Sequence, residues 1–150
     1  PVIDRNKFKS TGNVKKGAYV LAYGDESSPD KCDVILIATG SEVHLALSAR
    51  EHLSTIGIKA RVVSAPCLEW FTQQPVAYQE LVLPKNIKAR VSIEAGIAQS
   101  WYQFIGDSGV PVSLEHFGAS ASASVLFKEF GFTIENVVKA AKESITKAHG

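Results

Sequence analysis

The stretch VILIATGSEVHLAL (Val34–Leu47) decides the fold. Val34–Ala38 is apolar without alternation, which is typical of a central parallel strand that is covered on both faces. Thr39-Gly40-Ser41 follows, and the Thr39/Glu42 spacing fits a capping box at the start of a helix. The stretch therefore predicts a buried strand, a tight turn and a helix in direct succession.

The helix that begins here has an apolar side and a clear end. Its apolar residues at helical spacing are Val43, Ala46, Leu47 and Leu53. Gly57 is the kind of residue that commonly lies just past a helix C-terminus. We expect the helix to stop before Gly57.

Strand and helix patterns alternate along the rest of the chain. Further strands are expected at Ala18–Ala22, Ile58–Ser64, Ala89–Ala95 and Val112–His116. Helical segments are expected around Pro75, from Gly96 through Ile105, over Ser122–Phe130 and over Thr133–Ala148. This alternation is typical of βαβ units with right-handed crossovers. The sequence predicts an α/β fold, a three-layer α/β/α sandwich whose mostly parallel sheet has about five strands, with Ala18–Ala22 as an antiparallel edge strand.

The last of these helices has the strongest pattern. Its apolar stripe consists of Ile134, Val137, Val138, Ala141, Ile145 and Ala148. A single stripe of this width predicts a helix that packs one side on the sheet and leaves the other side in water.

Composition restricts the class of protein. The 150 residues are 45% hydrophobic and 21% charged, as in a globular domain with a core. A net charge of +1 gives no field that selects nucleic acid or an anionic membrane. No apolar run approaches the roughly 20 residues of a spanning helix. We expect neither nucleic acid nor a membrane as a partner.

The two cysteines, Cys32 and Cys67, indicate a reducing compartment. They form no CxxC motif and are too few for a disulfide-framed scaffold. We expect a cytoplasmic protein, in which Cys67 is a reduced thiol in or near the core.

The first residues differ from the rest. PVIDRNKFKSTGNVKKG is polar, the chain starts at Pro1, and it contains no methionine. We interpret residues 1–16 as a linker from a preceding domain and residues 17–150 as one domain cut from a longer chain. A small protein processed at its N-terminus is the alternative.

The turn Thr39-Gly40-Ser41 is a candidate phosphate site. In an open parallel sheet, ligands bind beyond the carboxyl ends of the strands, and free N–H groups at a helix start attract anions. Neither the G-x-G-x-x-G fingerprint nor the P-loop pattern is present, however. One glycine and a capping threonine are what any strand-to-helix turn needs, so we favour a simple turn.

Glu94 and His116 extend this candidate site. Each ends an expected strand, so both gather with Thr39, Gly40 and Ser41 at one edge of the sheet. A carboxylate and an imidazole there would suit acid–base chemistry or a regulatory anion. Because no nucleophile, metal set or cofactor motif accompanies them, we favour docking on another domain.

GDSG (Gly106–Gly109) is similar to the nucleophile segment of chymotrypsin-like proteases. Those proteases are all-β and place a histidine and an aspartate far upstream. Here the tetrapeptide lies between a helix and a strand, which predicts a turn.

Six segments, in this order, resemble the C-terminal domain of bacterial transketolases. They are ATGSEVHLAL, RVVSAPCLEWF, YQELVLP, ARVSIEAGIAQSWYQFIG, HFGASASASVLFKEFGFT and ENVVKAAKESI. CLEWF and EAGIAQSWYQ are most similar to actinobacterial members. The resemblance extends from Gly17 to Ile145, nearly the whole domain.

The resemblance implies a parent transferase of the pentose phosphate pathway. Such an enzyme uses thiamine diphosphate and Mg²⁺ or Ca²⁺ to move a two-carbon ketol unit from a ketose phosphate to an aldose phosphate. It is a homodimer, with active sites between the N-terminal domain of one subunit and the middle domain of the other. The catalytic, cofactor-binding and metal-binding residues belong to those domains, so none is assigned to this chain.

A fragment of this kind is expected to be inactive alone and to hold no cofactor. Its natural partners would be the N-terminal and middle domains of the parent chain, and its role would be structural, dimer-shaping or regulatory. Two alternatives stay open. One is the corresponding domain of deoxyxylulose-phosphate synthase or of a 2-oxo-acid dehydrogenase β subunit, and the other is a free-standing small-ligand module.

Overall fold

The computed structural model describes residues 16–28, 31–38, 42–94, 105–113 and 134–149. Within these residues the elements follow the order β1, β2, α3, β3, α4, α5, β4, β5, α8. Among these elements, helices separate the strands from β2 to β4, as the sequence predicts for an α/β domain.

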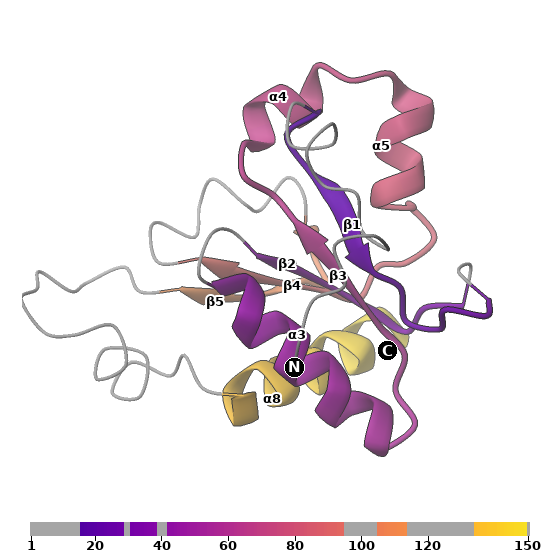
Figure 1. Cartoon of the computed structure of the whole chain (residues 1–150). Coiled ribbons are helices and arrows are strands. Elements are labelled where there is room, and N and C mark those ends of the chain that lie inside the picture. The colour runs from indigo at the N-terminus through magenta and orange to yellow at the C-terminus, as the bar shows by residue number, and fades with distance from the viewer. Residues whose placement is uncertain (1–15, 29–30, 39–41, 95–104, 114–133, 150) are drawn as a thin grey trace, which may run out of the picture.

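The described strands form one five-stranded sheet in the order β1-β3-β2-β4-β5 (Figure 1). Their bounds are β1 Tyr19–Ala22, β2 Val34–Ala38, β3 Ala60–Ser64, β4 Arg90–Glu94 and β5 Val110–Ser113. β1 runs antiparallel to β3, and the other three pairings are parallel. The predicted mostly parallel sheet with an antiparallel edge strand is confirmed.

Strand β2 lies at the centre of the sheet and is fully buried. Val34, Leu36 and Ala38 belong to one hydrophobic cluster, whereas Ile35 and Ile37 belong to another on the opposite face. Burial of successive side chains on both faces is the reason why this strand reads as an uninterrupted apolar run.

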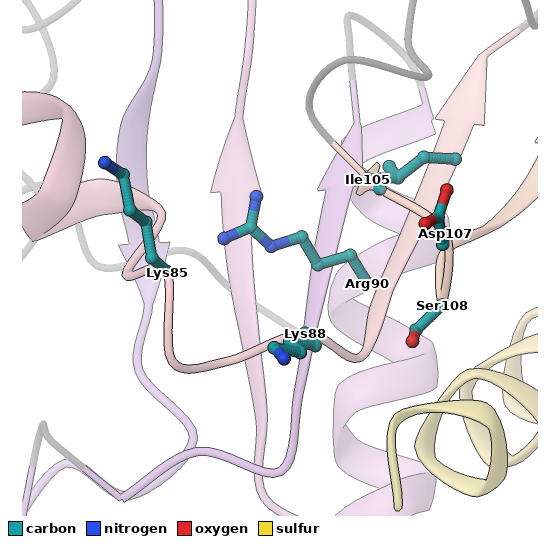
Figure 2. A pocket seen from close by; sticks show the side chains of 7 residues that line it. Lys85, Lys88, Arg90, Ile105, Asp107 and Ser108 are labelled. Atoms are coloured by element: carbon teal, nitrogen blue, oxygen red, sulfur yellow. The ribbon is translucent and has the colours of Figure 1, made fainter. Parts of the chain in front are cut away.

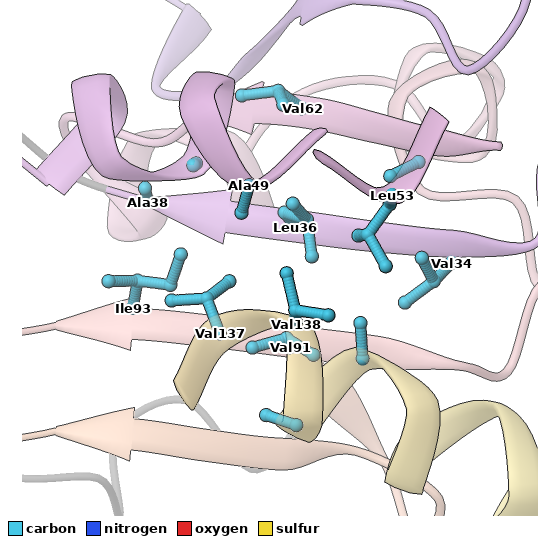
Figure 3. Packing of buried hydrophobic residues seen from close by; sticks show 14 of the residues in the cluster. Val34, Leu36, Ala38, Ala49, Leu53, Val62, Val91, Ile93, Val137 and Val138 are labelled. Atoms are coloured by element: carbon cyan, nitrogen blue, oxygen red, sulfur yellow. The ribbon is translucent and has the colours of Figure 1, made fainter. Parts of the chain in front are cut away.

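Two long helices, α3 (Glu42–Thr55) and α8 (Ile134–His149), cover one face, which we call the long-helix face (Figure 3). Small side chains meet the sheet here, with Ala46 and Ala49 from α3 and Ala141 from α8 fully buried. They let the two helices lie close to the strands, while Val137 and Leu53 fill the space between.

Helix α3 ends as predicted. The N–H groups of Gly57 and Ile58 donate to the carbonyls of Ser54 and Leu53, at 3.1 and 2.9 Å. Gly57 has φ +82°, which glycine adopts without the steric cost that a Cβ would bring.

Two short helices, α4 (Leu68–Thr72) and α5 (Val76–Val82), cover the other face, which we call the short-helix face (Figure 1). Pro75 stands at the N-cap of α5, in agreement with the helical turns predicted around it. Phe71, Val82 and Leu83 pack against Ile35, Ile37 and Val63. Helices therefore lie on both faces, and the three-layer arrangement is confirmed.

Strand β5 begins earlier than the sequence predicts. The alternation after Val112 indicates a strand over Val112–His116, whereas β5 spans Val110–Ser113. Pro111 lies within it, although proline cannot donate to a strand ladder. It is tolerated because, among the described strands, β5 pairs only with β4 and is an edge.

Some predicted features lie outside the described residues. They are the capping residue Thr39, most of the helix that Gly96 opens, and the helix over Ser122–Phe130. Among the described helices, none is long and apolar enough to span a bilayer.

Candidate functional site

The carboxyl ends of the parallel strands lie in register at one edge of the sheet. Ala38 of β2 pairs with Ser64 of β3 and Ile93 of β4, and Glu94 pairs with Ser113 of β5. Glu94 therefore stands at the predicted edge. Thr39, Gly40, Ser41 and His116 lie outside the described residues, so the anion or regulatory site they would form stays a prediction.

The opposite edge carries a hollow of about 440 Å³ at the amino ends of β4 and β5. Figure 2 shows the Arg90 guanidinium pointing toward Lys85, with Asp107 and Ser108 on the far wall. The residues that line the hollow include three cations, Lys85, Lys88 and Arg90, and one carboxylate, that of Asp107. Sequence reasoning missed this hollow, because its walls come from two loops far apart in the chain.

The Arg90 guanidinium donates hydrogen bonds to backbone carbonyls of the loop that precedes β4. Its Nε donates to the carbonyl of Ile87 at 2.9 Å, and its Nη2 donates to the carbonyls of Leu83 and Pro84 at 3.3 and 2.9 Å. Burial lowers the pKa of the Arg90 guanidinium, and the Glu80 carboxylate opposes this shift. The described contacts give Arg90 the role of fixing the loop between α5 and β4.

Ser144 of α8 joins both walls of the hollow to the long-helix face. Ser144 is fully buried, and its hydroxyl accepts a hydrogen bond from the backbone N–H of Arg90 at 2.7 Å. It also lies 2.6 Å from the Ser108 carbonyl, to which it donates. A serine between Glu143 and Ile145 gives no signal of this role in the sequence, because serine is common on solvent-facing helix surfaces.

The GDSG segment is a turn, as predicted. The Gly109 N–H donates to the Gly106 carbonyl at 3.2 Å, and Gly106 has φ +70°. Asp107 is exposed, and Ser108 contributes its carbonyl to Ser144. The segment leads the chain into β5.

A second arginine, Arg61, donates hydrogen bonds to carbonyls at the C-terminal end of α5. Arg61 of β3 is 4% exposed, and its Nη1 donates to the carbonyls of Leu81 and Val82 at 3.2 Å each. The guanidinium carbon lies 5.3 Å from the centroid of the Tyr23 ring, within cation–π distance. Arg61 and Arg90 together donate to four successive carbonyls, those of residues 81–84, at the C-terminus of α5 and just beyond it.

The described histidines and cysteines form no catalytic or metal cluster. His44, His52 and His149 are exposed. Cys32 and Cys67 are free and half-buried, in agreement with the predicted near-core thiol at Cys67. In the described part of the chain, no three His, Cys, Asp or Glu side chains are placed to hold a metal ion. These residues do not fit a metal–diphosphate site, so no chemical step is assigned to them.

Taken together, the topology and the two covered faces define a three-layer α/β domain with one antiparallel edge strand. A family model described as the transketolase-like TK C-terminal domain matches residues 17–133. The chain belongs to the family of transketolase C-terminal domains.

Individual relatives agree with this assignment. The transketolase of Mycobacterium leprae is 52% identical over 134 residues, which are 89% of this chain and 19% of the relative. That of Mycobacterium bovis is 49% identical over 97% of this chain and 20% of the relative. The resemblance to actinobacterial members is thus confirmed, and the related thiamine enzymes are not favoured.

Solved structures give the same result. The transketolase from Leishmania mexicana superposes with a TM-score of 0.80 and 37% identity, covering 93% of this chain and 19% of that one. The chain therefore spans only 19% or 20% of the length of the relatives named here.

Proposed function

We propose that this chain is the C-terminal domain of a transketolase and contributes structure rather than catalytic groups to ketol transfer. The observation that carries the proposal is 52% identity over 89% of this chain to a transketolase of which the match covers only 19%. In this proposal residues 1–16 are the linker from the preceding domain, and residues 17–150 are the domain itself. The family match beginning at residue 17 supports this division.

The parent protein would be a cytoplasmic homodimer. It would use thiamine diphosphate and Mg²⁺ or Ca²⁺ to transfer a two-carbon ketol unit between sugar phosphates. The domain described here would pack against the N-terminal and middle domains of the parent and help to shape the dimer. The structural role is supported by the polar side chains near the hollow, because in the described residues Arg90 and Ser144 bind backbone carbonyls of loops.

A domain exchange tests this proposal. The segment of Mycobacterium leprae transketolase that matches this chain is replaced by the present sequence, and ketol transfer is measured with thiamine diphosphate and Mg²⁺. We expect the chimera to retain activity and to sediment as a dimer. The control is the same enzyme with the segment deleted. A chimera that folds and dimerises without turnover contradicts the assigned role.

Catalytic silence has a separate test. The 150-residue chain is assayed alone under the same conditions, and we expect no ketol transfer above the rate without protein. Turnover by this chain would overturn the claim that the catalytic groups lie elsewhere in the parent.

The anion or regulatory site at the carboxyl edge is a second, narrower proposal. Its support is the register of the parallel strands, which puts Ala38, Ile93 and Glu94 at the same edge of the sheet. Calorimetry with inorganic phosphate and sugar phosphates, repeated on Ser41→Ala and His116→Ala, tests it. Heats that do not differ among the three proteins remove the site.

A further inference from the structure

The hollow at the amino ends of β4 and β5 is large enough for a small molecule. Its volume of about 440 Å³ lies within the range of about 300–1,000 Å³ that is usual for ligand pockets. Of its lining residues, Ile105 is buried, whereas Lys85 and Lys88 are exposed. The turn after Ile105 lies close to it because Gly109 has no side chain, since a Cβ there would be 2.4 Å from the Ile105 Cβ.

Hydrogen bonds hold both walls of the hollow. On one wall, the Lys85 N–H donates to a Glu80 carboxylate oxygen at 2.8 Å. The Ser144 hydroxyl accepts from the Arg90 N–H at 2.7 Å and donates to the Ser108 carbonyl at 2.6 Å, so it links one wall to the other. A site whose walls are already in place loses little conformational freedom when a ligand binds.

The two walls differ in charge. Figure 2 shows the cationic side chains of Lys85, Lys88 and Arg90 on one side, and Asp107 with Ser108 on the other. In the part of the chain that the structure describes, neither lysine ammonium group forms an ion pair. The Arg90 guanidinium already donates to three backbone carbonyls. The two lysines are therefore the cations that a ligand can contact.

Glu80 reduces this positive charge without cancelling it. Its carboxylate lines a neighbouring hollow of about 330 Å³ and is not among the described residues that line this one. Three cations and one carboxylate among the lining residues leave an excess of two positive charges. One positive charge remains when Glu80 is counted as well. An excess of this sign in a concave site favours an anion.

We propose that the hollow binds a small phosphate ester that carries hydroxyl groups. Its phosphate oxygens accept charge-assisted hydrogen bonds from the Lys85 and Lys88 ammonium groups. Its hydroxyl groups donate to the Asp107 carboxylate, which is an acceptor only. A bare phosphate ion fits less well, because Asp107 repels it and gains no hydrogen bond from it. The site lies at the amino ends of the strands, so it is separate from the carboxyl edge and goes beyond the structural role proposed for the domain.

An NMR titration of the 150-residue chain at constant pH and ionic strength tests the proposal. The probes are glycerol phosphate, inorganic phosphate and glycerol, and the readout is the amide resonances of residues 106–108. We expect saturable shifts with glycerol phosphate, weaker binding of inorganic phosphate and no shift with glycerol. Ser41→Ala should leave the titration unchanged, which distinguishes this site from the carboxyl edge. The absence of a saturable shift, or inorganic phosphate binding as tightly as glycerol phosphate, overturns the proposal.

Lysine variants test the anionic end of the ligand. Lys85→Gln and Lys88→Gln should each weaken the binding of glycerol phosphate about two- to fivefold, the size expected for partly exposed charge pairs. Lys142→Gln is the matched control, because Lys142 is an exposed lysine of α8 that does not line the hollow. An equal loss in the control would mean that the net charge of the chain attracts the probe, and it would contradict the site.

Asp107→Asn tests the hydroxyl end. The substitution removes a repelling charge, so inorganic phosphate should bind about two- to fivefold more tightly. It also replaces a charged acceptor by a neutral one, so the advantage of glycerol phosphate over inorganic phosphate should become smaller. An advantage that stays the same contradicts the contact between Asp107 and the ligand hydroxyl groups.

Discussion

The two faces of the sheet bury the same central strand by different means. On the long-helix face, α3 and α8 present apolar stripes to the strands, and alanines lie at the closest contacts. On the short-helix face, α4 and α5 are too short to do the same, and Arg61 and Arg90 enter the packing. A helix of seven residues leaves as many unpaired terminal carbonyls as one of 16. Burying a short helix therefore requires donors from elsewhere in the fold.

The difference extends to the outer surfaces. The long-helix face turns exposed charged side chains of α8, such as Glu135 and Lys139, toward water. The short-helix face exposes Trp70, Val76 and Leu81. The outer surface of the long-helix face is charged and suited to water, whereas the exposed apolar side chains of the short-helix face are suited to a further contact.

The largest effect is expected for Phe71→Ala, which removes the main apolar contact of α4 with the sheet. Phe71 is 1% exposed, so its truncation should lower the free energy of unfolding by about 3–5 kcal/mol. Val76→Ala is the control, because Val76 is 71% exposed and should change stability by less than about 0.5 kcal/mol. Urea unfolding measures both. Equal effects would mean that α4 does not pack on the sheet.

Arg61→Met tests whether the short-helix face depends on a buried cation. Methionine keeps most of the length but removes the donors to the Leu81 and Val82 carbonyls. We expect a loss of about 1.5–3 kcal/mol, the range for hydrogen bonds that involve charged groups. The substitution should also speed up amide hydrogen exchange more in α5 than in α3. Uniformly faster exchange in both helices would contradict a local role.

Ser144→Ala tests the link between the two faces. It leaves the Arg90 N–H and the Ser108 carbonyl without their buried partner, so we expect a loss of about 1–3 kcal/mol. Thr146→Ala is the control, since Thr146 is exposed and its hydroxyl contacts only the Lys142 carbonyl within α8. Alanine has a higher helix propensity than serine or threonine, so a control as destabilising as Ser144→Ala would contradict the assigned buried link.

Cys32 provides a chemical probe of the short-helix face. Burial raises the pKa of this thiol, while the Arg61 guanidinium opposes the shift. Alkylation of Cys32, measured in Cys67→Ser, should be slower in the folded chain than in urea, with its pH midpoint moved upward. A raised folded pKa means that the stabilising contribution is present below the ordinary thiol pKa and is lost as the pH rises through the folded value. Equal rates in both states would show that the thiol is not covered.

The smallest effect concerns Asp25, which lies outside both faces. Hydrogen bonds from Ser27 and Lys59 hold the pKa of its carboxylate well below the ordinary range. A depressed pKa stabilises the fold above the unfolded pKa, and this contribution is lost as the pH falls through the acid range. Comparing thermal unfolding of Asp25→Asn with the parent chain at neutral and acid pH checks this. A difference that grows on acidification would contradict it.

The elements that the sequence predicted best are those with strong local patterns. The bounds of β2 agree residue by residue, and α8 agrees to within one residue, because an unbroken apolar run and a helical stripe both depend on neighbouring residues. The start of β5 was placed two residues too late, since the pattern gave no sign that an edge strand accepts Pro111. Of the candidate site, only the position of Glu94 at the strand end is described.

The sequence by itself determined the α/β class, the succession of strands and helices, and the family. These properties depend on local periodicity and on contiguous segments of sequence. Only the tertiary structure decided that Ser144 joins Arg90 to Ser108, that two arginines close the end of α5, and that Lys85 and Asp107 line the same hollow. The reason is that hydrogen-bond partners and exposed surfaces depend on residues that are distant in sequence, and no pattern of neighbours records which of them meet.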